Sequence, residues 1–190
     1  MKVLLVPEDQ THDQYILKPV IEALFADLEF RARVSVLPDP RLHGDSEALD
    51  PEVIRGIVRD NPMEDLFLLL VDRDCDRNHA EARAAAIQKE HATKLICCLA
   101  IQEIEVWMLA LHADSLDAPL SEIRRHCDPK ERWAEPLLKY LGTDGPGAGR
   151  KKAMRALQGQ WHSLRDRCTE LKSLQDEIGA WRQTQSSVGI

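Results

Sequence analysis

The sequence contains no apolar run near the roughly 20 residues that a helix needs to cross a bilayer. It also has no surplus of basic residues: the 190-residue chain carries a net charge of -7, so no overall positive field attracts nucleic acid. Local basic patches and bound cations can still offset that charge. The start becomes acidic at Glu8, too soon for a signal peptide. These absences argue against a membrane partner and predict a cytoplasmic protein.

Cysteine is scarce, and its spacing shows no pattern. The five cysteines are Cys75, Cys97, Cys98, Cys127 and Cys168. Their number is odd and no Cys-x-x-Cys pair occurs, so neither a zinc site nor a disulfide framework is expected. Cys97 and Cys98 lie inside an apolar run and are expected to be buried thiols, the usual place of free cysteine. The sequence therefore predicts a reduced protein.

What the sequence does contain is a regular alternation of short apolar runs and helical stripes. Strands are expected at residues 2–6, 31–37, 66–71 and 94–100, and helices at residues 11–27, 51–60 and 78–91. Alternation of this kind is typical of an α/β fold with a parallel sheet. The strands are continuously apolar, which indicates burial on both faces. From residue 101 the pattern becomes helical, so we expect an α/β domain at residues 1–112 and a helical extension packed on it at residues 113–190.

Acidic residues follow two of the predicted strands. Glu8 comes after the first strand, and Asp72, Asp74 and Asp76 come after the third. Because parallel strands end at one edge of a sheet, these side chains are expected to converge there. Carboxylate oxygens suit Mg²⁺ or Mn²⁺, and Glu8 can ligate the ion or act as a general base. The alternative is a solvated acidic turn in which Asp76 caps the next helix.

A further pair of acids, Glu103 and Glu105, follows the fourth predicted strand. We expect the next helix to begin near residue 101, which places the two acids on different faces of that helix. Glu103 lies nearer the strand end and is therefore the expected fifth metal ligand. Trp107, one turn further on, is expected to pack in the core rather than to stack on a base.

Basic residues cluster at Arg150, Lys151 and Lys152, directly after a glycine-rich loop at residues 143–149. Such residues bind backbone phosphates, and a glycine loop allows close approach. The alternative is a solvated helix start. Arg73, between the acids, can hold a substrate phosphate or pair with its acidic neighbours. The glycine loop does not match the phosphate-binding GxxxxGK[ST] pattern, so ATP would have to bind a partner.

The order strand–Glu8, then strand–Asp72-x-Asp74, resembles a Toprim domain, the catalytic module of topoisomerases, bacterial primases and OLD (overcoming-lysogenisation) nucleases. Asp76 matches the third acid of the DxDxD variant. Residues 8–11 followed by a helix are similar to the EGxTE opening of small bacterial Toprim-like proteins often encoded near ATPases, with Asp9 and His12 departing from that pattern. The resemblance covers roughly residues 1–112.

The resemblance implies a Rossmann-like Toprim domain with a four-stranded parallel sheet in the order 2-1-3-4 and a C-terminal helical extension. It implies a metal-dependent phosphoryl-transfer enzyme, a Toprim-type nuclease that cleaves DNA or RNA, in which Glu8, Asp72 and Asp74 are catalytic. Such a nuclease would fit an anti-phage system. The rival interpretation is a regulatory subunit that keeps the acids but acts only with a partner ATPase. A receiver-like signalling domain is a third, weaker interpretation because the sequence lacks a receiver's final lysine-bearing strand.

Overall fold

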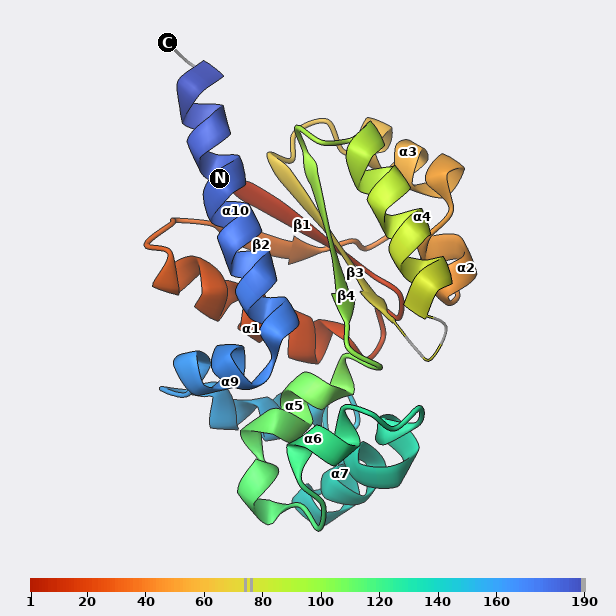
Figure 1. The fold of residues 1–190 in the computed structure, drawn as a ribbon, viewed down its shortest axis with the longest axis vertical. Helices are drawn as coiled ribbons and strands as arrows, with labels where there is room; N and C mark the ends of the chain where they lie inside the picture. Colours follow the sequence, from red (N-terminus) through yellow and green to blue (C-terminus); the bar gives the residue numbers. More distant parts are fainter. Residues whose placement is uncertain (74, 76, 189–190) are drawn as a thin grey trace.

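A computed structural model describes residues 1–73, 75 and 77–188 of the chain. The fold is α/β, with one sheet of four parallel strands in the order β2-β1-β3-β4 (Figure 1). The strands are β1 (Lys2–Pro7), β2 (Arg33–Val36), β3 (Leu66–Asp72) and β4 (Leu95–Ala100). The predicted fold class and strand order are confirmed, and both agree with a Rossmann-like fold.

The pairing of β1 with β3 decides where the candidate site lies. Val3 pairs with Leu66 and Pro7 with Leu70, so the two central strands run side by side to their carboxyl ends. Residues that follow these strands, Glu8 and Asp72 among them, are thereby brought to the same edge of the sheet. The strand order also changes direction between β1 and β3, which is the point where open α/β sheets bind ligands.

Helices cover both faces of the sheet (Figure 1). One face is covered by α2 (Asp45–Ala48), α3 (Pro51–Asp60) and α4 (Arg77–Glu90), and the other by α1 (Gln14–Asp27) and α10 (Thr169–Val188). Successive strand residues point to opposite faces, so two separate apolar clusters form. Val3 of β1 joins the cluster beneath α1, whereas Leu4 joins the cluster beneath α3 and α4.

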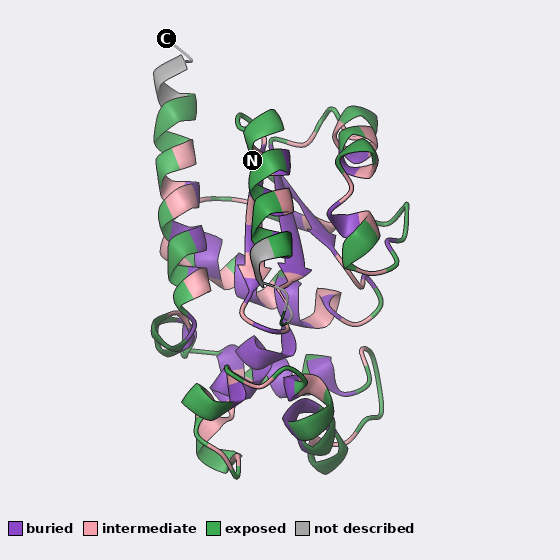
Figure 2. Ribbon diagram, turned by 45° about the vertical axis from the view of Figure 1, so that its right-hand side comes forward, coloured by how far each residue is buried: buried purple, intermediate pink, exposed green. Residues whose placement is uncertain are grey.

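The helical layer below the sheet shares its core with the α1 face. It comprises α5 (Glu105–Leu111), α6 (Leu120–Ile123), α7 (Glu135–Leu141), α8 (Arg150–Ala153) and α9 (Trp161–Arg167), with the short turns η1 (Ala113–Ser115), η2 (Lys130–Ala134) and η3 (Met154–Leu157). Figure 2 shows buried residues continuing from the strands into this layer. Over the described part of the chain, no helix combines the length and the apolar character that crossing a membrane requires.

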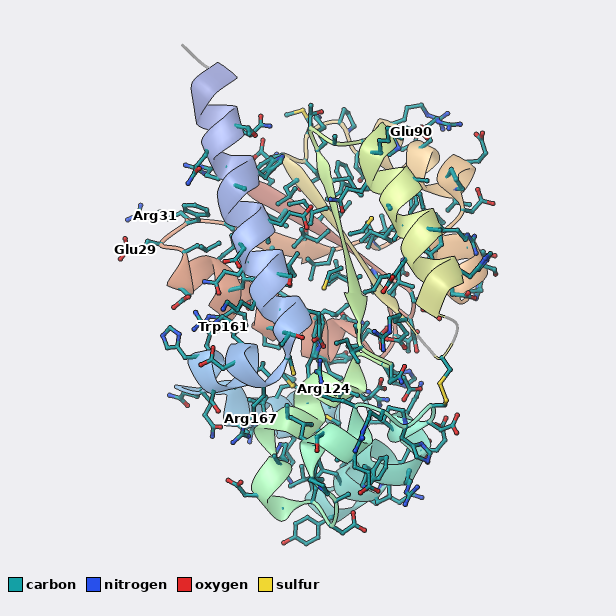
Figure 3. All side chains as sticks on the ribbon, viewed as in Figure 1. Glu29, Arg31, Glu90, Arg124, Trp161 and Arg167 are labelled. Atoms are coloured by element: carbon teal, nitrogen blue, oxygen red, sulfur yellow. A yellow bond between two sulfur atoms is a disulfide. The ribbon has the colours of Figure 1, made fainter. Side chains whose placement is uncertain are left out.

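One buried acid fastens α10 to this layer. Glu170 accepts a hydrogen bond from the indole N–H of Trp107 (2.8 Å). It also forms an ion pair with Arg124 (2.6 Å), a residue labelled in Figure 3. Trp107 is fully buried, so its predicted role in the core is confirmed. The backbone N–H of Ile101, directly after β4, also donates to Glu170 (3.5 Å), so the last helix is tied to the segment that leaves the sheet.

The start of α5 differs from the prediction. The helix begins at Glu105 and not near residue 101, because the chain first makes a turn in which Gln102 has a φ of 69°. The turn ends at Ile104, whose backbone N–H donates to Asp72 Oδ1 (2.7 Å). Glu103 therefore lies in the turn before the helix, and Glu105 is the first helical residue.

The cysteine prediction is wrong for one pair. Cys75 and Cys127 form a disulfide with their Cα atoms 5.6 Å apart (yellow bond, Figure 3). The two residues are 52 positions apart, and only the packing of the helical layer against the end of β3 brings them together. Sequence spacing carries no sign of that contact. Cys98 is a buried free thiol and Cys97 a partly buried one, as expected.

Candidate active site

The ends of β1 and β3 bring Glu8 and Asp72 together, as the sequence predicts. The backbone N–H of Asp72 donates to Glu8 Oε2 across 3.3 Å. The Asp72 carboxylate in turn accepts the N–H of Ile104 from the turn after β4. Three chain segments that are far apart in sequence therefore meet at Asp72, one at its backbone N–H and one at its carboxylate.

Asp72 lies in a strongly acidic environment. Burial raises the pKa of its carboxyl group well above the usual range. Three neighbouring carboxyl groups raise this pKa further, and they belong to Asp13, Glu105 and Glu8. We refer to these residues, Glu8, Asp13, Asp72 and Glu105, as the acid cluster. Like charges held together out of water disfavour ionisation unless a cation or a proton compensates them.

Asp13 is a member of the acid cluster that the sequence reasoning missed. It stands directly before α1, is only 5% exposed, and accepts the backbone N–H of Asp9 through Oδ2 (3.1 Å). Burial, followed by the charges of Glu105 and Asp9, raises the pKa of Asp13 to about 8. A signal was present: Asp13 stands one residue beyond His12, the position where the sequence departs from the EGxTE pattern.

Glu105 belongs to the acid cluster, in place of the predicted Glu103. Its side chain is 1% exposed and forms an ion pair with Arg150 Nη2 at 2.5 Å, with Lys130 Nζ 3.9 Å away. Glu103 instead accepts the backbone N–H of Lys130 (2.7 Å), and burial raises the pKa of Glu103 to about 7. Glu103 was preferred because it lies nearer the end of β4, whereas Glu105 is one of the carboxyl groups that act on Asp72.

Two cations from the helical layer reach the acid cluster among the described residues. Arg150 and Lys130 both pair with Glu105, and the charge of Lys130 also acts on Asp13. Hard carboxylate oxygens of the kind gathered here suit Mg²⁺ or Mn²⁺. The described residues nevertheless include no group of three or more His, Cys, Asp or Glu side chains placed to hold a metal ion. The donor chemistry fits the ion, and the described residues alone do not complete its ligand set.

Two of the predicted metal ligands, Asp74 and Asp76, lie outside the described residues. Arg73, between them and Asp72, donates its backbone N–H to the carbonyl of Ala100 (3.0 Å). This bond belongs to the last residue pair of the β3–β4 ladder, Asp72 with Ala100.

The predicted basic cluster is divided by the fold. Arg150 is 5% exposed and points into the acid cluster, whereas Lys151 and Lys152 are exposed. The ammonium group of Lys152 donates to the carbonyl of Leu141. The three basic residues therefore do not share one surface. Arg150 belongs to the interior of the site. Lys130, the other cation there, had no distinguishing sequence signal.

Comparison of the chain with protein-family models, with curated proteins and with solved structures finds no match in any of the three. A functional assignment therefore rests on the chemistry of the acid cluster and on its place at the carboxyl edge of the sheet.

Proposed function

We propose that this protein is a metal-dependent phosphoryl-transfer enzyme, a Toprim-type nuclease that uses Mg²⁺ or Mn²⁺. The observation that carries the proposal is the acid cluster, four carboxyl groups gathered around Asp72 at the switch point of a parallel sheet. Burying such charge is costly, and proteins retain it where a cation or a reaction needs it.

In this proposal Asp72 and Glu8 hold the cation, with Asp74 as the third ligand and Asp76 beside it. A bound divalent ion neutralises charge on a phosphate and lowers the pKa of a water molecule. Glu8 is next to the backbone of Asp72, so it can ligate or take a proton from the attacking water. Asp13 and Glu105 supply the surrounding negative charge.

The proposed substrate is nucleic acid, DNA or RNA, bound by cations around the acidic edge. Lys151 and Lys152 are exposed and follow the glycine-rich loop, and Arg73 adjoins Asp72. The net charge of -7 leaves little general attraction for nucleic acid, so contacts at these positions would account for most of the binding. A place in a cytoplasmic anti-phage system remains part of the proposal.

A second candidate is a regulatory subunit that acts with a partner ATPase. One observation favours it: Arg150 and Lys130 already pair with Glu105, and no three described side chains assemble a metal site. Internal ion pairs of this kind can hold a binding surface in shape without catalysis. The two candidates differ in whether the isolated chain cleaves nucleic acid.

The test is cleavage of single- and double-stranded DNA and RNA by the isolated chain, with Mn²⁺, with Mg²⁺ and with a chelator. Binding of Mn²⁺ should also raise the unfolding free energy, by about 2.7 kcal/mol at one hundred times Kd. Replacing Asp72 and Asp74 by Ala should abolish both effects, whereas Asp114→Asn, at an exposed acid elsewhere, should leave them unchanged. A folded wild-type protein that is stabilised by Mn²⁺ but cuts none of the four substrates favours the subunit.

A further inference from the structure

We infer that the helical layer completes the site, with Arg150 acting as a positioning residue that holds Glu105 in the acid cluster rather than as a contact to the nucleic-acid backbone. The catalytic part of this inference rests on the proposed function, and the structural part does not.

The Arg150–Glu105 pair is closed to solvent on both sides. Arg150 is 5% exposed, Glu105 is 1% exposed, and the atoms Nη2 and Oε1 are 2.5 Å apart. A buried carboxylate needs a close polar partner, because water cannot replace one. Arg150 supplies this partner and fixes the direction of the Glu105 carboxylate.

Two glycines allow Arg150 to reach the interior. Gly149 directly precedes it with a φ of 91°, a conformation that side-chain-bearing residues rarely adopt. Gly147 lies against the ring of Tyr15, where an added Cβ would stand 2.3 Å from a ring carbon. The carbonyl of Gly147 also accepts Arg150 Nη1 at 3.4 Å. The glycine-rich loop thus packs onto α1 and directs the arginine inward.

Lys130 supplies a second cation from the same layer. Its ammonium group lies 3.9 Å from Glu105 and stays partly exposed. Burial lowers the pKa of Lys130, but the nearby carboxylates raise it more, so the group remains charged. Arg150 holds Glu105 from the interior, and Lys130 faces it from the solvent side.

One donor of Arg150 has no protein partner. Its Nε atom is buried and forms no hydrogen bond to any described residue. Guanidinium groups in stable ion pairs normally use most of their five donors. The remaining donor is available to a water molecule held inside the acid cluster.

Positioning and phosphate contact predict different kinetics for Arg150→Ala. If Arg150 positions Glu105, the substitution lowers kcat about 10- to 100-fold, as loss of a supporting partner does, and leaves KM for the oligonucleotide little changed. Guanidinium ion added at millimolar concentration should refill the space and restore part of kcat. Lys139→Ala is the matched control, because Lys139 is an exposed basic residue of α7 in the same layer and is assigned to no site; it should leave kcat unchanged. A rise in KM with kcat unchanged in Arg150→Ala would overturn the inference.

A second measurement needs no activity. The unfolding midpoints of Glu105→Gln, Arg150→Gln and the double variant are compared without metal. Each single variant leaves a buried partner unpaired, so the double variant should be more stable than either. Additive losses would overturn the pairing. Absence of cleavage by wild type would instead count against the proposed function, and this cycle would still decide the structural part.

Discussion

The carboxyl edge of the sheet and the helical layer below it contribute different charges to one site. The sheet supplies the acids Glu8 and Asp72 at the ends of paired strands, whereas the helical layer supplies one acid, Glu105, together with the cations Arg150 and Lys130. Acids at strand ends are brought together by the topology of the sheet itself. The cations of the helical layer are brought to the site only by the packing of loops and short helices. The sheet therefore sets where chemistry can occur, and the helical layer sets how much of the charge remains for a ligand.

The strongest test of this comparison is on the sheet side. Glu8→Gln keeps the size and one hydrogen-bonding oxygen of the side chain but removes its charge and basicity. If Glu8 is a ligand or base, cleavage should fall by about 10²–10⁴, the usual contribution of one positioned acid–base group. The measurement is single-turnover cleavage by a variant whose circular dichroism matches wild type. Full activity in such a variant would remove Glu8 from the mechanism.

The disulfide is a covalent link between the two regions. Cys75 follows the end of β3, and Cys127 lies three residues before Lys130. In the chain-entropy description, a crosslink over 52 residues stabilises the folded state by about 4 kcal/mol. Cys127→Ser should lower the unfolding free energy by up to this amount in denaturant titrations. A reducing agent should have the same effect on wild type and none on the variant; equal stability of oxidised and reduced wild type would contradict the prediction.

The sequence predicts the sheet far better than it predicts the helical layer. Four continuous apolar runs specify the strands, and alternation with helices specifies their parallel order. The positions of Glu8 and Asp72 can be predicted as well, because the strand ends are fixed once the strands are known. Glu105 was missed because the turn at Gln102 delays the helix, and a positive φ at a glutamine leaves no signal in composition. Arg150 was expected to contact phosphates because it follows a glycine-rich loop beside two lysines, and nothing in that pattern reveals its buried partner 45 positions away.

The pH dependence of stability tests whether the cations of the helical layer offset the negative charge around Asp13. Its pKa of about 8 lies above the ordinary value of 3.8, so the folded protein holds a proton that the unfolded chain releases. Stability must therefore fall as pH rises between these values, by at most about 1.4 kcal/mol per pH unit from this group. Asp13→Asn should flatten that decline in denaturant titrations between pH 5 and pH 8. An unchanged slope would show that Arg150 and Lys130 already neutralise the acid cluster.

Bound metal, like the substitution Asp13→Asn, should reduce the loss of stability as the pH rises. A cation that binds the acid cluster competes with protons, so Mn²⁺ affinity should increase as pH rises through the pKa of Asp13. Titration calorimetry in buffers of different ionisation enthalpy measures the protons released per ion. Release in wild type that is absent from Asp13→Asn would place the proton on this residue, whereas equal release would place it on another carboxyl group.

The smallest expected effect concerns the exposed lysines of the helical layer. Lys151 and Lys152 follow Arg150 directly but face solvent, so they can contact phosphates that Arg150 cannot reach. Replacing both by Gln should weaken binding of all duplex sequences alike and flatten the logarithmic salt dependence by about 0.9 per lost phosphate contact. Metal affinity should not change, because neither lysine contacts the acid cluster in the described structure. Since the net charge of -7 gives little background attraction, the loss should be measurable by fluorescence anisotropy across a salt series. An unchanged slope would make these lysines a solvated helix start and leave Arg150 and Lys130 as the only functional cations assigned to the layer.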